Sequence, residues 1–95
     1  MSTAITSDTK YTPNPDIITG KNKQNTLLYD PKNGEIITLN DTSAVLWTLI
    51  LKKYTVKKMI DYLYKHYETE RVIIEKDIRV LLSGWLNKKR IIQIQ

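Results

Sequence analysis

The spacing of polar and apolar positions changes along the chain, from short strand-like runs in the first half to helical spacing in the second. Residues 25–29 and 35–39 are rich in β-branched, aliphatic or aromatic residues, and they flank the segment Asp-Pro-Lys-Asn-Gly at 30–34. Proline fixes φ for the start of a type I turn, and Asn-Gly supplies the positive φ that leaves it. This pattern predicts a β-hairpin, and residues 16–19 are a weaker candidate for a strand before it.

From residue 40 onward, the pattern predicts three helices. Asn40 is a suitable N-cap for a first helix that runs to about Leu51 and is apolar on nearly every side, so we expect it to be the buried centre. A second helix follows the N-cap Thr55 and repeats its apolar positions every three or four residues. The third helix is predicted over residues 71–88, and its core stripe consists of Ile74, Ile78, Leu81, Leu82 and Trp85.

The two ends of the chain differ in character. Residues 1–15 are mostly polar and end at Pro13 and Pro15, which predicts a flexible N-terminal tail and a single domain over residues 16–95. Residues 91–94, Ile-Ile-Gln-Ile, are a candidate final strand. Three strands followed by three helices predict an α+β fold, in which one helical layer covers a small antiparallel sheet.

Composition excludes several kinds of chemistry. The chain has 95 residues, no Cys and one His, His66, so we predict no thiolate nucleophile, no metal site and no catalytic residues. Its three glycines are isolated and form no phosphate-binding loop, so we expect no cofactor. The first ten residues do not resemble a secretory signal and no apolar run is long enough to span a bilayer, which predicts a cytoplasmic protein.

The net charge of +5 favours an acidic partner, which includes nucleic acid, an anionic membrane and an acidic peptide, or it serves solubility alone. A winged-helix DNA-binding protein is the main alternative. A DNA-reading helix needs a basic approach to phosphate, whereas Glu68 and Glu70 lead into the third helix and Glu75 and Asp77 follow. We therefore expect neither a nucleic-acid nor a membrane partner.

Two surface features predict a peptide-binding site. In the second hairpin strand, Ile37 and Leu39 face one side and Ile36 and Thr38 the other, and an exposed edge of this strand can pair with a guest strand. The flank of the third helix at positions 73, 77, 80 and 84 is more apolar than the opposite flank at 72, 76, 79 and 83. This flank either rests on the sheet or forms a groove with the strand edge. The predicted peptide-binding residues are Glu35, Ile36, Ile37, Thr38, Leu39, Ile73, Asp77, Val80, Leu81 and Gly84.

Gly84 costs the third helix about 1 kcal/mol relative to alanine. A close approach by another backbone would explain why a glycine is tolerated at this position. Small apolar pockets lined by Ile36, Ile73, Val80 and Leu81 would then select the side chains of the guest.

An ordered series of short motifs covers about two-thirds of the chain. The series consists of Leu27-Leu28-Tyr29-Asp30, a turn ending at Gly34, Leu39-Asn40, Val45-Leu46, Thr55-Val56, Asp77-Ile78, Leu81-Leu82 and Ile91-Ile92. With this set, the chain resembles the PqqD-like peptide chaperones, also called RiPP recognition elements. Trp47, directly after Val45-Leu46, is most similar to members in lasso-peptide clusters, where the domain is the recognition half of a split leader peptidase.

This resemblance implies a winged-helix-like fold of three strands and three helices. It further implies that the leader of a ribosomally made precursor peptide lies as an added strand against residues 35–39, packed on the third helix. A monomeric domain of this kind delivers the precursor to a separate cysteine-protease-type leader peptidase and an ATP-dependent macrocyclase, or in other clusters to a radical S-adenosylmethionine enzyme. The chain departs from the family at Glu70, where relatives often carry Asp or Ser as the N-cap.

Overall fold

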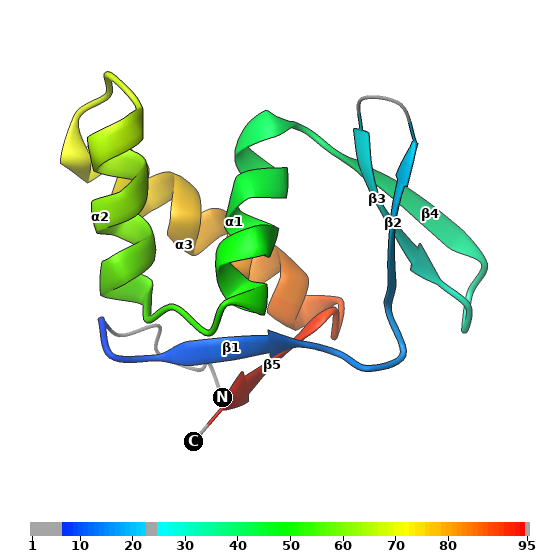
Figure 1. The fold of residues 1–95 in the computed structure, drawn as a ribbon. Helices are drawn as coiled ribbons and strands as arrows, with labels where there is room; N and C mark the ends of the chain where they lie inside the picture. The colour runs from blue at the N-terminus through cyan, green and yellow to red at the C-terminus, as the bar shows by residue number, and fades with distance from the viewer. Residues whose placement is uncertain (1–6, 23–24, 95) are drawn as a thin grey trace.

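The structure of the chain, a computed structural model, describes residues 7–22 and 25–94. In chain order, the elements are β1 (Lys10–Pro13), β2 (Ile18–Asn22), β3 (Asn25–Asp30), β4 (Glu35–Leu39), α1 (Asp41–Leu51), α2 (Val56–His66), α3 (Arg71–Asn87) and β5 (Ile91–Ile94). Strands β2, β3 and β4 form an antiparallel sheet in that order, and β1 pairs with β5. Figure 1 shows the three-stranded sheet to one side of the helices and the β1–β5 ribbon beneath them. The predicted fold class, an antiparallel three-stranded sheet followed by three helices, is confirmed.

The prediction of a flexible tail over residues 1–15 is wrong for its second half. Residues Lys10–Pro13 form β1, which runs antiparallel to β5, and the side chain of Tyr11 is completely buried. The N–H groups of Val56 and Lys57 donate to the carbonyls of Thr9 and Ser7 at 2.9 Å, which ties this segment to the start of α2. The sequence pattern missed β1 because its partner lies about 80 positions away, and a single tyrosine among polar residues carries no strand period. Residues 1–6 lie outside the described residues.

The first predicted strand is displaced. It was expected at residues 16–19, whereas β2 spans Ile18–Asn22. Asn14 explains the shift, because its side-chain oxygen accepts the N–H of Asp16 and its carbonyl accepts the N–H of Ile17, both at 2.9 Å. These bonds hold residues 14–17 in a turn, so the strand begins only after them.

The helix boundaries follow the predicted caps. The Asn40 side chain accepts from the N–H of Ser43 at 2.8 Å, and the Thr55 hydroxyl accepts from the N–H of Lys58 at 3.1 Å. These bonds satisfy N–H groups that the first turn of a helix leaves without a partner. Glu70 makes no side-chain cap bond at α3, in agreement with its identity as a poor cap.

The core lies between the helices and is organised around α1. Trp47 packs edge-on against Trp85 of α3, with ring centroids 5.2 Å apart, and its indole N–H donates to the Thr19 hydroxyl of β2 at 3.0 Å. One buried side chain thus connects α1, α3 and the sheet. Leu51 is an exception to the predicted burial of α1, since 49% of its surface is exposed. The predicted core stripe of α3 is buried at four positions, and the fifth, Leu81, is only partly buried.

Candidate functional site

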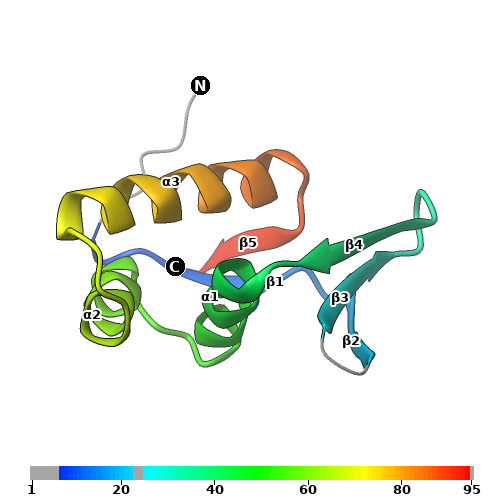
Figure 2. The same cartoon turned by 90° about the horizontal axis from the view of Figure 1, so that it is seen from above.

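Strand β4 lies at the edge of the three-stranded sheet. It pairs with β3 from Asp30↔Glu35 to Thr26↔Leu39, and no strand of the described chain occupies its other edge. In Figure 2, β4 is the strand of this sheet nearest to α3, with β3 and β2 beyond it. The backbone groups on the outer edge of β4 are therefore available on the side of the molecule where α3 lies.

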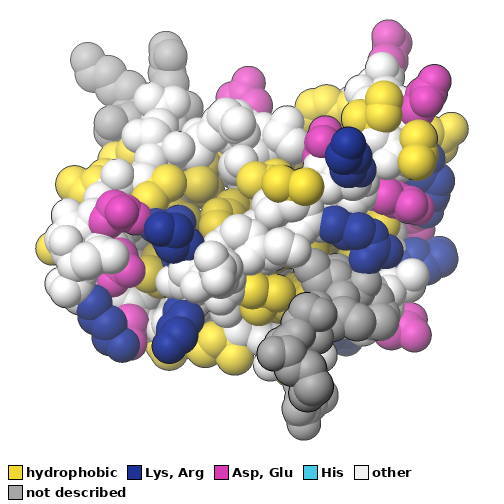
Figure 3. Space-filling view, turned by 180° about the vertical axis from the view of Figure 1, so that it is seen from behind, with side chains coloured by type: hydrophobic (Ala, Val, Ile, Leu, Met, Phe, Trp, Pro, Cys, Tyr) yellow, Lys and Arg dark blue, Asp and Glu magenta, His cyan; other side chains and the backbone are white. Residues whose placement is uncertain are grey.

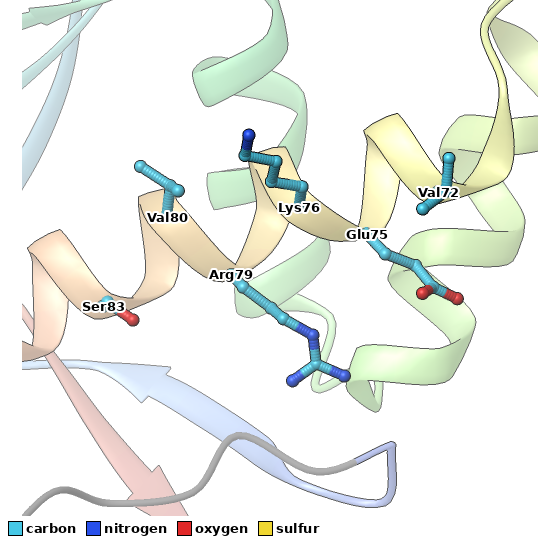
Figure 4. A pocket seen from close by; sticks show the side chains of 6 residues that line it. All are labelled: Val72, Glu75, Lys76, Arg79, Val80 and Ser83. Carbon is cyan, nitrogen blue, oxygen red and sulfur yellow. The ribbon is translucent and has the colours of Figure 1, made fainter.

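A hollow of about 310 Å³ lies between α3 and the junction of β4 with α1. It is lined by Asn40, Thr42, Ser43, Asp77, Val80 and Leu81. Because Asn40 directly follows the last residue of β4, the hollow adjoins the end of this strand. Figure 4 shows the Val80 side chain leaving α3 on the side opposite to Arg79, which points toward β1.

Three predicted site residues of α3, Asp77, Val80 and Leu81, meet at this hollow. Val80 has 64% of its surface exposed although it is apolar. Two members of the predicted flank, Asp77 and Val80, therefore face the hollow at the end of β4, and neither is covered by the sheet. Figure 3 shows the face that carries α3, where hydrophobic side chains form a broken band with Lys and Arg side chains beside it.

The predicted residues of β4 alternate as expected. Leu39 is buried and Ile37 is half-buried on the core side, whereas Ile36 is 64% exposed on the opposite face of the sheet. Ile36 lies opposite Tyr29 of β3, and Tyr29 lies opposite Ile18 of β2. All three side chains are exposed. This places Ile36 in an apolar row on the outer face of the sheet and not in a pocket with Val80 and Leu81.

Two predicted residues of α3 do not line the hollow. Ile73 is 46% exposed, and neither it nor Gly84 is among the lining residues. Nothing lies within 4 Å of the point that a Cβ at Gly84 would occupy. The expected close approach of another backbone at Gly84 is therefore absent from the described part of the chain.

A second, smaller pocket of about 90 Å³ opens between α2, α3 and the start of α1. Its walls combine aliphatic side chains with a polar rim, and they are formed by Thr42, Leu63, Tyr67, Thr69, Ile74, Asp77, Ile78 and Leu81. Thr42, Asp77 and Leu81 also line the hollow beside β4, so the two depressions adjoin. The sequence pattern missed the contributions of Thr42 and Thr69, because their exposed polar positions near helix starts carry no signal for a pocket.

An ion pair holds β4 relative to α3. The Arg90 guanidinium, only 11% exposed, donates to the carboxylate of Glu35, which is 46% exposed. The backbone of Arg90 is itself held in place. Its backbone N–H donates to the carbonyl of Trp85 at 2.8 Å, and its carbonyl accepts from the backbone N–H of Asn14 at 2.9 Å. The start of β4 is thereby attached to the connection between α3 and β5, and sequence reasoning did not identify Arg90.

A carboxyl group with a shifted pKa lies on α2. The hydrogen bond from Arg71, and to a lesser extent that from Lys57, lowers the pKa of the half-exposed Asp61 carboxyl. Within residues 7–22 and 25–94, no group of three or more His, Asp or Glu side chains is arranged to hold a metal ion. No helix in the same residues is long and apolar enough to cross a bilayer.

Comparison with known proteins places this geometry in a family. The family described as coenzyme PQQ synthesis protein D (PqqD) matches residues 25–91, which span β3, β4 and all three helices. The chain belongs to the PqqD family. The resemblance predicted from the ordered motifs is therefore confirmed. A comparison with curated proteins finds no match.

Two solved structures share the fold of this PqqD-family chain. One is described as lasso peptide synthetase B1 complexed with the leader peptide; it has 25% sequence identity, a TM-score of 0.81, and coverage of 87% of this chain and 98% of that chain. The other is TbiB1 in complex with the TbiA(beta) leader peptide, with 18% identity, a TM-score of 0.78, and coverage of 84% and 93%. In both comparisons the shared fold extends over most of this chain and nearly the whole of the other chain.

Proposed function

We propose that this PqqD-family chain binds the leader segment of a ribosomally made precursor peptide as an added strand on β4. The observation that carries the proposal is the outer edge of β4, which pairs with no strand among residues 7–22 and 25–94 and ends at the hollow lined by Asp77, Val80 and Leu81. It is supported by the two structures of the same fold, each of which was solved with a leader peptide.

The chemistry of recognition follows from strand addition. Backbone N–H and C=O groups of the guest pair with the edge of β4 and provide affinity that depends little on sequence. Successive guest side chains point to opposite faces of the extended sheet. One set therefore lies beside Ile36 on the outer face, and the other set faces α3, where Val80 and Leu81 offer apolar contact.

We further propose that the domain performs no chemistry itself and hands the bound precursor to separate enzymes. In a lasso-peptide cluster, these are a cysteine-protease-type leader peptidase and an ATP-dependent macrocyclase, and the similarity to a lasso peptide synthetase B1 supports this choice. The alternative recipient is a radical S-adenosylmethionine enzyme, as in other clusters of the family. Both assignments place the protein in the cytoplasm, where precursor peptides are made.

The proposal is tested with Val80→Asp and the matched control Val72→Asp. Both valines lie on α3 and are similarly exposed, at 64% and 66%, but only Val80 lines the hollow beside β4. Docking of a peptide buries the exposed part of Val80, which stabilises the complex by about 1 kcal/mol. An aspartate at this position loses the stabilisation from apolar burial, and docking of the peptide would also force its carboxylate out of water near Asp77. We expect the dissociation constant to rise at least about 100-fold for Val80→Asp and to change little for Val72→Asp.

The measurement is fluorescence anisotropy with a fluorescein-labelled leader peptide, taken from a short precursor that is to be sought in the reading frames next to this gene. Circular dichroism of both variants checks that α3 remains helical. Unchanged binding by Val80→Asp, or equal losses in the two variants, would place the peptide elsewhere. A labelled DNA duplex at low salt serves as a second probe, and tighter binding to it than to the leader would favour the DNA-binding alternative.

A further inference from the structure

We propose that the pocket between α2 and α3 is a second subsite, which takes a branched aliphatic side chain from the part of the guest peptide that extends beyond β4. This inference rests on the proposed function, because it concerns the same peptide. It adds a second anchor point, outside the residues that pair with the strand.

The chemistry of the pocket selects the kind of side chain. Leu63, Ile74 and Ile78 form part of its wall, and all three belong to the core between α2 and α3. These side chains are held by packing on every other side, so the wall is apolar and already in place before a ligand arrives. An aliphatic group that enters removes its own surface and this wall from water, which is favourable.

The size of the pocket limits the side chain further. Its volume is about 90 Å³, against about 310 Å³ for the hollow that begins after Leu39. This smaller space suits a single side chain, such as the branched end of leucine, isoleucine or valine. Thr42 and Thr69, both exposed, also line the pocket, so polar residues border its apolar wall.

The pocket is reached along a continuous path from β4. Thr42, Asp77 and Leu81 line both the pocket and the hollow that begins after Leu39, so a peptide that leaves the strand edge passes directly from one to the other. Asp77 lines both depressions, and its carboxylate can accept a backbone N–H of the passing peptide. Asp77 therefore separates the two anchor points and holds the backbone between them.

The position of the anchor in the peptide follows from strand direction. Strand β4 runs toward α1, and every pairing in its sheet is antiparallel. A guest that continues this pattern runs the opposite way, so its N-terminal part lies beyond Leu39. We therefore expect the aliphatic residue that fills the pocket to lie on the N-terminal side of the strand-paired segment.

The test combines a blocked pocket with an alanine scan of the labelled leader peptide. Thr69→Trp places an indole at the wall of the pocket from an exposed position before α3, and Glu68→Trp is the neighbouring control, which does not line the pocket. With the wild-type protein, we expect that replacing one aliphatic leader residue, N-terminal to the paired segment, by alanine lowers the affinity about tenfold or more. Thr69→Trp should weaken binding of the unaltered leader by a similar factor and remove the effect of that alanine, whereas Glu68→Trp should do neither.

The outcomes separate this subsite from the proposed function. If Val80→Asp abolishes binding but Thr69→Trp does not weaken it, the subsite is refuted and strand addition stands. The subsite is equally refuted if the alanine scan finds no aliphatic residue outside the paired segment, or if Thr69→Trp weakens all scanned peptides alike. If the leader does not bind, or binds independently of Val80, both proposals fail.

Discussion

The ion pair between Glu35 and Arg90 makes a quantitative prediction about how β4 is held. Replacing Glu35 with glutamine keeps the size of the side chain and removes the negative charge opposite a guanidinium that is only 11% exposed. The Nε of Arg90 already has no hydrogen-bond partner within the described residues. The substitution therefore leaves the nearly buried Arg90 guanidinium without a negative charge opposite it.

The size of the effect lies between two limits. Exposed ion pairs contribute about 0.2–1 kcal/mol, whereas removal of one partner from a fully buried pair costs about 3–5 kcal/mol. Here one partner is nearly buried and the other is 46% exposed, and the glutamine oxygen can still accept a hydrogen bond. We expect Glu35→Gln to lower the free energy of unfolding by about 1–2 kcal/mol. With a urea dependence near 1 kcal/mol per molar for a chain of this size, the unfolding midpoint falls by about 1–2 M.

Urea unfolding followed by tryptophan fluorescence measures this change. Trp47 and Trp85 are both buried against each other, so their emission reports the loss of the core. A double-mutant cycle with Arg90→Met isolates the pair, and we expect the double variant to lose less stability than the sum of the single variants. Glu68→Gln, at an exposed carboxylate, is the control. A change below about 0.3 kcal/mol for Glu35→Gln, or additive effects in the cycle, would refute this account of the pair.

Three further changes test neighbouring features. Thr38→Pro removes a backbone N–H from β4, so it should weaken leader binding in the anisotropy assay. Ile36→Asp should weaken leader binding less than Val80→Asp does, because Ile36 lies on the outer face of the sheet. Tyr11→Phe removes a buried hydroxyl without a hydrogen-bond partner in the described residues, so urea unfolding should show unchanged or greater stability. Burial raises the pKa of the Tyr11 phenol; its protonated form therefore stabilises the fold below pH of about 10, and this contribution should decline above that pH in the wild type but not in Tyr11→Phe.

Much of the fold could be predicted from the sequence because its determinants are local. The caps Asn40 and Thr55 satisfy helix N–H groups within three residues of themselves, and the turn at 30–34 is specified by its own proline and glycine. The burial of α1 and the stripe on α3 follow from the spacing of apolar residues along one element. The resemblance to the PqqD family was likewise read from local motifs in their order along the chain, and the family match covers residues 25–91.

The site was only partly predictable, because its position depends on contacts between distant segments. The sequence indicated that β4 and one flank of α3 are candidates, but not that Asp77, Val80 and Leu81 meet Asn40 at one hollow. It grouped Ile36 with Val80, whereas Ile36 lies exposed on the outer face of the sheet, opposite Tyr29 of β3. Side-chain alternation defines two faces, and only the packing of the sheet on α1 decides which of them is buried.

By itself, the sequence determined the type and approximate limits of most elements, since period, caps and turn residues act over a few neighbouring positions. Only the tertiary structure decided that Lys10–Pro13 joins β5, that Arg90 holds Glu35, and that a pocket opens between α2 and α3. Each of these depends on residues that are distant along the chain. Their meeting follows from the simultaneous burial of all the apolar faces in one core, which no single segment encodes.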